Sequence, residues 1–184
     1  MRIVAGEYGG RKLKAVPGMK TRPTTDKVKE AMFNIMGPYF AGGVALDLFA
    51  GSGGLSIEAV SRGVEHAYLV DRQYQAIKTI KENIEVTKQP ERFTVLKADA
   101  QRILSQFSEQ GLHFDYIFLD PPYKQQQILA LLGQMVQKQL LATDAIIVCE
   151  TDQEAKLPDR LPGFECFRQA DYGITRLTFY RYQK

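Results

Sequence analysis

Residues 46–54 read Leu46-Asp47-Leu48-Phe49-Ala50-Gly51-Ser52-Gly53-Gly54, an apolar run that enters a glycine-rich turn. Glycine permits a tight turn and lets the backbone approach a ligand closely, and a helix that begins there offers free N–H groups. An ordinary turn between a strand and a helix has the same pattern, so Gly51 and Gly53 alone do not separate the two interpretations. The stretch nevertheless predicts a strand, a tight turn and a helix.

Outward from this stretch, short apolar runs alternate with helical periodicities. We expect strands at 44–49, 67–70, 93–97, 116–119 and 145–150, and helices near residues 28–36, 53–62, 73–87, 99–108 and 125–139. Continuous apolar strands are typical of a parallel sheet that is covered on both faces. Residues 164–168 and 175–181 instead read as a hairpin across Asp171-Tyr172-Gly173. The expected fold class is therefore α/β: a doubly wound, mostly parallel seven-stranded sheet that ends in an antiparallel hairpin.

The first 23 residues differ in character from the rest of the chain. Residues 2–4 and 11–16 are expected to pair as strands across Gly9-Gly10. We therefore assign residues 1–23 to a small basic N-terminal β-hairpin extension, and residues 24–184 to the main domain.

Charge is unevenly distributed along the chain. The whole chain has a formal net charge of +3, whereas residues 1–29 carry eight basic and two acidic side chains, a net +6 that leaves −3 for the rest. A basic arm on a mildly acidic body favours a polyanionic partner, although a solvated N-terminus would have the same charge.

Composition excludes several classes of protein. No apolar run approaches the roughly 20 residues that a membrane-spanning helix needs, and the N-terminus has no secretory signature, so we expect a cytoplasmic protein without a membrane partner. Cys149 and Cys166 form no C-x-x-C pair and are expected to be reduced thiols. His66 and His113 have no nearby cysteine partners, so no metal site is expected.

An acidic residue after the second strand extends the glycine pattern. Asp71 lies 20 residues after Gly51, where a carboxylate can accept hydrogen bonds from ribose hydroxyls or can cap the helix that follows. The third glycine of a dinucleotide fingerprint is replaced by Ser56, and Asp47 would repel a pyrophosphate. A ligand with a cationic amine and a sulfonium suits these acids better, so S-adenosylmethionine is favoured over NAD.

A third acidic residue completes the expected cofactor site. Asp99 follows the third strand, where it can approach an adenine edge together with the Ala100 backbone or, equally, cap the next helix. The cofactor-binding residues that we expect are Asp47, Phe49, Gly51, Ser52, Gly53, Asp71, Asp99 and Ala100.

The fourth strand ends in Asp120-Pro121-Pro122-Tyr123. The prolines fix the backbone and remove two N–H donors, so the carbonyl groups here are available to a ligand. Asp120 and the Pro121 carbonyl can each accept one N–H of an exocyclic amine, and Tyr123 can stack on an extruded base. A proline-rich turn is the alternative. We expect these four residues to form a catalytic centre that aligns an amine nitrogen for methyl transfer.

Five stretches together resemble, over the full length of the chain, the bacterial small-subunit ribosomal RNA guanine-N2 methyltransferases that modify guanine 966 of 16S rRNA. They are Arg2-Ile3-Val4-Ala5-Gly6, Gly10-Arg11-Lys12-Leu13, residues 21–31, residues 47–53, and residues 120–123. The sequence departs from that family at Gly54, where alanine is expected, and at Lys27 and Lys29, where arginine is common.

The resemblance implies a Rossmann-like class I methyltransferase fold with S-adenosylmethionine as cofactor. It also implies that the partner is 16S rRNA in a small ribosomal subunit or an assembly intermediate, held by the basic N-terminal hairpin. The RNA-binding residues that we expect are Arg2, Arg11, Lys12, Lys14 and Arg22.

Three other functions share parts of this pattern. A DNA adenine-N6 methyltransferase also uses Asp-Pro-Pro-Tyr but normally needs a separate target-reading domain, for which few residues remain here. Protein glutamine methyltransferases typically have Asn-Pro-Pro-Tyr, whereas this chain has aspartate at the first position, Asp120. A non-enzymatic RNA-binding module would not need an intact acid and glycine loop. Methyl transfer to RNA or to DNA separates these alternatives.

Overall fold

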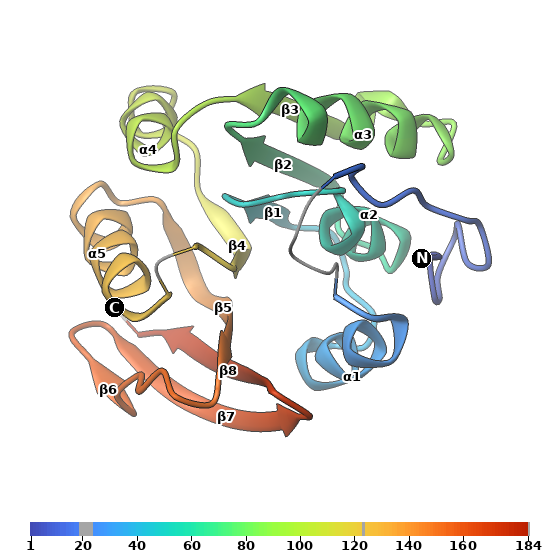
Figure 1. Cartoon of the computed structure of the whole chain (residues 1–184). Helices are drawn as coiled ribbons and strands as arrows, with labels where there is room; N and C mark the ends of the chain where they lie inside the picture. Colours follow the sequence, from blue (N-terminus) through green and yellow to red (C-terminus); the bar gives the residue numbers. More distant parts are fainter. Residues whose placement is uncertain (19–23, 123, 184) are drawn as a thin grey trace. The chain divides into compact units, whose positions relative to one another are not determined.

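The computed structural model describes residues 1–18, 24–122 and 124–183. Its fold is α/β, with eight strands among these residues (Figure 1). The chain divides into two compact units, residues 1–99 and residues 100–184, and each is described by itself.

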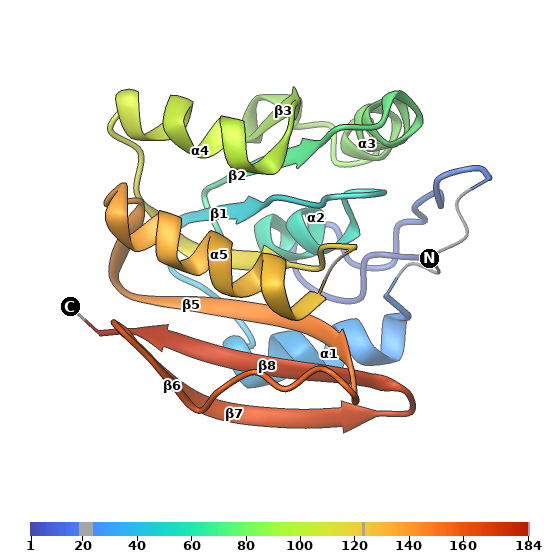
Figure 2. The same ribbon diagram turned by 60° about the vertical axis from the view of Figure 1, so that its left-hand side comes forward.

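The first unit is a parallel sheet with strand order β3-β2-β1. Its elements are α1 (Asp26–Met36), β1 (Val44–Asp47), α2 (Gly54–Ser61), β2 (His66–Asp71), α3 (Tyr74–Glu85), a 3-10 turn (Pro90–Arg92) and β3 (Phe93–Lys97). Helices α2 and α3 lie on the same side of these strands (Figures 1 and 2). The parallel register places the carboxyl ends of the three strands at one edge of this unit, as expected for a ligand-binding α/β sheet.

Local sequence signals explain where α1 and β1 begin and end. The Thr25 hydroxyl accepts a hydrogen bond from the Val28 N–H at 3.3 Å and caps α1. Strand β1 ends at Asp47, two residues before the predicted end, because the chain turns there toward the glycines.

The N-terminal segment, residues 1–18, packs onto the first unit. Its predicted hairpin is reduced to one antiparallel bridge between Arg2 and Lys12, extended by a 2.8 Å hydrogen bond from the Ile3 N–H to the Arg11 carbonyl. Ile3, Tyr8 and Leu13 are buried, with exposed fractions of 0%, 2% and 6%. The segment therefore contributes hydrophobic side chains to the core, which a solvated arm would not.

The second unit changes from parallel to antiparallel pairing. Its elements are α4 (Ala100–Glu109), β4 (Phe114–Leu119), α5 (Lys124–Gln137), β5 (Leu141–Asp152), β6 (Arg160–Leu161), β7 (Phe164–Tyr172) and β8 (Thr175–Tyr182). Strand β4 runs parallel to β5, whereas β5–β8, β8–β7 and β7–β6 are antiparallel. The predicted C-terminal hairpin is confirmed, with its turn at Gly173–Ile174.

The structure has one strand more than the sequence predicts among the described residues. The sequence predicts seven strands, and the structure adds the two-residue β6, which pairs with the start of β7 through Arg160 with Glu165 and Leu161 with Phe164. A run of two residues is too short for an alternation of apolar and polar side chains to reveal it.

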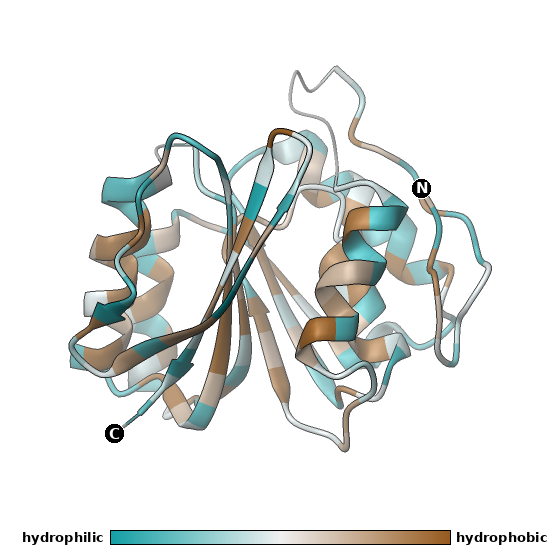
Figure 3. Cartoon of the chain, turned by 90° about the horizontal axis from the view of Figure 1, so that it is seen from below, coloured by the Kyte–Doolittle hydropathy of each residue, from teal (hydrophilic) through white to brown (hydrophobic). Residues whose placement is uncertain are grey.

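Hydropathy follows the predicted layers within each unit. In Figure 3 the central strands are largely brown, the strands of the C-terminal hairpin also carry teal stretches, and the helices carry both brown and teal positions. Among the described residues, no helix is long and apolar enough to cross a membrane.

Candidate functional site

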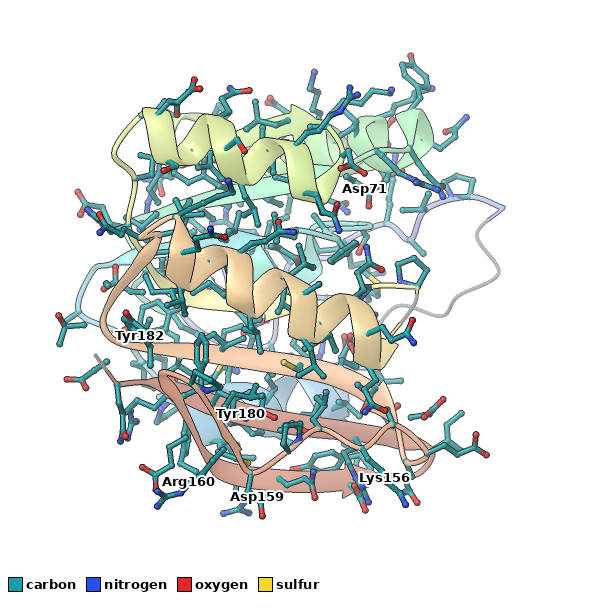
Figure 4. All side chains as sticks on the ribbon, turned by 90° about the vertical axis from the view of Figure 1, so that its left-hand side faces the viewer. Asp71, Lys156, Asp159, Arg160, Tyr180 and Tyr182 are labelled. Atoms are coloured by element: carbon teal, nitrogen blue, oxygen red, sulfur yellow. The ribbon has the colours of Figure 1, made fainter. Side chains whose placement is uncertain are left out.

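Asp71 holds the loop that follows β1. It is the last residue of β2 and is labelled in Figure 4. One carboxylate oxygen accepts the Gly51 N–H at 3.0 Å, and the other accepts the Gln73 N–H at 2.9 Å. Each oxygen has a second lone pair, so both can also accept a ligand hydroxyl. Asp71 therefore fixes residues 48–53, called here the glycine loop, relative to the start of α3.

The glycines of this loop have different roles. Gly51 and Gly53 have φ angles of +57° and +84°, which favour glycine. A Cβ at Gly53 would lie 3.1 Å from Leu69 Cδ2, so Gly53 serves the packing of the loop against β2. No heavy atom of the described residues, chain neighbours aside, lies within 4 Å of a Cβ built at Gly51, so the backbone there is open to a ligand.

Asp47 shapes the first turn of the glycine loop. Its side chain is buried, at 3% exposed, and one carboxylate oxygen accepts the Phe49 N–H at 3.0 Å. This contact is local, two residues along the chain, and it turns β1 into the loop. Asp47 and Asp71 thus both lie at the carboxyl ends of neighbouring strands and both accept backbone N–H groups of the same loop.

Asp99 and Ala100 lie where the chain enters α4. Asp99 is exposed and directly precedes Ala100, the buried first residue of that helix. This is the position of a helix cap, which is the alternative that the sequence leaves open for Asp99.

The Asp-Pro-Pro-Tyr motif begins directly after β4. Asp120 is exposed, Pro121 is buried and Pro122 is exposed, while Tyr123 lies outside the described residues. Leu119, the last residue of β4, is 1% exposed and anchors the motif to the core of the second unit. A rigid, partly exposed segment of this kind can present carboxylate and carbonyl oxygens to an amine.

The basic residues of the N-terminal segment are not equivalent. The Arg11 guanidinium donates to the Val86 and Thr87 carbonyl oxygens at 3.0 and 3.4 Å, where α3 ends. It also lies over the Tyr8 ring, 5.3 Å from the ring centroid. Arg11 therefore stabilises the end of α3, in addition to any contact that it makes with a ligand.

Other basic residues of the segment are exposed as well. The Arg2 and Lys14 side chains are 62% and 74% exposed, and they approach Asp26 and Glu82 at 3.8 and 3.3 Å. Lys12 is exposed as well, whereas Arg22 lies outside the described residues.

Lys29 belongs to a buried ionic cluster that the sequence did not reveal. Its ammonium group lies 3.3 Å from the Glu58 carboxylate, and the Arg62 Nε lies 2.7 Å from the same carboxylate. The three side chains are at most 3% exposed. Burial lowers the pKa of Lys29, and the Glu58 charge opposes that shift. Only the four-residue spacing of Glu58 and Arg62 could have suggested part of this cluster.

Glu58 also holds the N-terminal segment. Its two oxygens accept the Val4 and Ala5 N–H groups at 2.8 and 3.1 Å. The stretch from Arg2 to Gly6 is therefore bound to α2 through its backbone. The N-terminal segment, which the resemblance associates with RNA, therefore also has a structural role.

Comparisons with known proteins identify a family and relatives that are named as rRNA methyltransferases. The profile of a family described as "Conserved hypothetical protein 95" matches residues 1–181. The chain is 48% identical, over 98% of both chains, to a Bacillus subtilis protein named "Putative rRNA methyltransferase YlbH". It is 32% identical to the "Ribosomal RNA small subunit methyltransferase D" of Escherichia coli K12, over 98% of this chain and 89% of that one.

Solved structures share the fold. An Escherichia coli structure titled a "Putative methyltransferase" superposes with a TM-score of 0.87 at 28% identity, over 100% of this chain and 98% of that one. A second structure, titled as "a putative methyltransferase complexed with SAH", has a TM-score of 0.67 at 14% identity, over 84% of this chain and 48% of that one. At that identity the second likeness concerns the fold alone.

Proposed function

The chain belongs to the family described as conserved hypothetical protein 95, and from this premise we propose that it is an S-adenosylmethionine-dependent methyltransferase of small-subunit ribosomal RNA. The proposed reaction transfers a methyl group to the exocyclic N2 amine of a guanine, namely guanine 966 of 16S rRNA. The names of two relatives, an rRNA methyltransferase and a small-subunit rRNA methyltransferase, support the class of reaction and the class of RNA.

One observation carries the proposal: the Asp71 carboxylate accepts the Gly51 N–H at 3.0 Å. This bond sets the acid and the open face of Gly51 side by side at the carboxyl ends of β1 and β2. Ligands of open α/β sheets bind at that edge, and an acid there suits ribose hydroxyls. The residues present therefore fit an adenosine-containing methyl donor, which supplies an activated methyl group when bound.

Most residues of the proposed donor site belong to the first unit. Asp71 would accept hydrogen bonds from the ribose, and Asp99 with the Ala100 backbone would meet the adenine edge. Asp47 would favour the positive charge of the methionine portion. The glycine loop, through Phe49 to Gly53, would allow close approach of the backbone.

The proposed acceptor site uses the segment after β4. Asp120 and the Pro121 carbonyl would accept the two hydrogens of the amine, which orients its lone pair for attack on the methyl carbon. The amine nitrogen becomes acidic as it is alkylated, so Asp120 or water would take the released proton. Pro122 would keep the segment rigid, and Tyr123 would stack on the guanine.

Basic side chains of the N-terminal segment would hold the RNA backbone. The exposure of Lys12 and Lys14 supports this part of the proposal. Residues 1–23 would act as an RNA-binding extension and residues 24–184 as the methyltransferase domain. Arg22 would clamp a phosphate next to the extruded base, since its guanidinium can bind a phosphate through two hydrogen bonds.

The decisive experiment maps methylated nucleotides in 16S rRNA from cells with and without this protein. We expect one guanine-N2 methylation to disappear in the deletion strain and to return when purified protein and S-adenosylmethionine are added to its small subunits. A parallel reaction with DNA tests the adenine-N6 alternative. Methylation of DNA and not of rRNA would contradict the proposal.

A further inference from the structure

Asn83 joins two parts of the first unit that have different proposed roles. It lies on α3 and is 1% exposed. Its side-chain oxygen accepts the Lys14 N–H at 2.8 Å, and its side-chain nitrogen donates to the Lys14 carbonyl at 2.9 Å. The same nitrogen donates to the Ser52 carbonyl at 2.8 Å. One buried amide therefore binds the N-terminal segment and the glycine loop at once.

A second contact links the same two segments. The Ser52 hydroxyl donates to the Met1 sulfur at 3.9 Å, and a Cβ built at Gly54 would lie 3.6 Å from Met1 Cε. The Met1 carbonyl accepts the Leu13 N–H at 2.9 Å, next to Lys14. The start of the chain thus lies against the loop and is tied to the stretch that carries Lys12 and Lys14.

The hydrogen bonds form a continuous path through the first unit. It runs from the exposed Lys14 through Asn83 to the Ser52 carbonyl, and the neighbouring Gly51 N–H is held by Asp71. Both N–H donors and the oxygen of the Asn83 amide group are used on these two segments. Displacement of either segment leaves a buried polar group without its partner, which is costly.

We infer that Asn83 is a positioning residue that couples RNA binding by the N-terminal segment to methyl-donor binding by the glycine loop. This inference rests on the proposed function. RNA that orders the segment around Lys14 favours one position of the Ser52 carbonyl, and a ligand on the loop favours the same position of the segment. Such coupling is reciprocal: each ligand tightens the other by the same factor.

The test uses SAH as the donor-site probe and compares the full chain with two variants. Asn83→Asp keeps the size of the side chain but replaces its N–H donors by an acceptor that faces the Ser52 and Lys14 carbonyls. Thr79→Val is the matched control, because Thr79 lies one turn earlier on α3, is 3% exposed, and donates only within the helix, to the Gln75 carbonyl. We expect Asn83→Asp to weaken SAH binding in calorimetry about 5- to 100-fold, and Thr79→Val to leave it unchanged.

Coupling itself is measured with small subunits from cells that lack this protein. The wild-type chain should bind them at least about five-fold more tightly when saturated with SAH, the lower end of typical coupling factors. In Asn83→Asp, saturating SAH should no longer change the affinity for subunits. Thr79→Val should retain the wild-type ratio of subunit affinities with and without SAH, even if its free energy of unfolding falls. If Asn83 had only a structural role, Asn83→Asp would retain this ratio as well.

Hydrogen exchange of the wild-type chain keeps the inference testable if Asn83→Asp does not fold. The Lys14 amide, which donates to Asn83, should exchange at least about ten-fold more slowly at a hundred-fold excess of SAH over its dissociation constant. The Tyr8 amide donates to the Ser61 hydroxyl at 3.0 Å and serves as the control, with no change expected. An unchanged Lys14 amide, with SAH bound, overturns the coupling and leaves the proposed function intact. Absence of SAH binding to the wild-type chain overturns the proposed function instead.

Discussion

Glu58 and Lys29 form an ion pair of 3.3 Å in which the two side chains are 0% and 3% exposed. The pair connects α2 to α1, and the same carboxylate binds Arg62 and two backbone N–H groups of the N-terminal segment. A buried charge is tolerated only where partners of this kind surround it. The N-terminal segment is therefore attached to the first unit by a fully engaged carboxylate.

Glu58→Gln should lower the free energy of unfolding by about 3–5 kcal/mol, because it leaves Lys29 and Arg62 buried without their counter-charge. Urea unfolding measures this loss. Glu82→Gln is the control, since Glu82 pairs with Lys14 at the surface and should change stability by less than about 1 kcal/mol. Similar losses for both variants would show that the buried cluster contributes no more than a surface pair.

Gly6→Ala should be more destabilising than Gly10→Ala. Both glycines have positive φ angles, +86° and +88°, so alanine costs about 1–2 kcal/mol of backbone strain at either site. A Cβ at Gly6 would also overlap the Ser61 carbonyl, whereas nothing in the described residues lies within 4 Å of one at Gly10. Thermal or urea unfolding of the two variants should differ clearly, and equal losses would contradict the close approach of the segment to α2.

Asp71→Ala should weaken SAH binding by about 1–3 kcal/mol, the range for loss of charge-assisted hydrogen bonds. Asp71→Asn should weaken it as well, because its amide N–H₂ would face one of the two N–H groups that the carboxylate accepts, Gly51 or Gln73. Calorimetry with SAH gives both values. Glu85→Gln, an exposed change at the end of α3, is the control, and wild-type affinity in Asp71→Ala would remove Asp71 from the donor site.

Asp120→Ala should lower turnover on small subunits on the order of 10²–10³-fold while SAH affinity stays within about two-fold of wild type, because one electrostatic contact to the amine is lost. Single-turnover methyl transfer with labelled S-adenosylmethionine measures this effect. Glu109→Ala, at the exposed end of α4, should leave turnover unchanged. Near-normal turnover in Asp120→Ala would show that the segment does not orient the amine.

Lys12→Gln and Arg11→Gln should separate RNA contact from structural support. Lys12 is exposed, so its loss should flatten the slope of log affinity against log salt for small subunits by about 0.7 without a change in stability. Arg11 binds the carbonyl groups at the end of α3, so Arg11→Gln should cost about 0.3–1 kcal/mol of stability. Filter binding across salt concentrations and urea unfolding give both quantities. A smaller slope change for Lys12→Gln than for Arg11→Gln would reverse the assignment.

Much of the fold follows from short-range patterns. Strand β3 begins and ends at Phe93 and Lys97 as predicted, and α1 lies where apolar residues recur from Val28 to Met36. These patterns are reliable because the periodicity of a strand or helix depends on neighbouring residues alone. The glycine loop and the acids at Asp47 and Asp71 are likewise visible in the sequence, since they lie within or directly after apolar runs.

The order of the amino acids is enough to place particular residue types at the ends of the strands, and so to indicate the class of chemistry that each unit can support. Which basic residues are exposed to a partner depends instead on how the chain packs. Lys29 counts toward the basic arm in the sequence, yet it is buried against Glu58, 29 positions away; Arg11 lies at the end of α3, some 75 positions away. Asn83 carried no signal at all, because its three partners, at Lys14 and Ser52, come from backbone groups that every sequence possesses. Burial and long-range hydrogen bonds depend on how distant segments pack, and no local pattern encodes that.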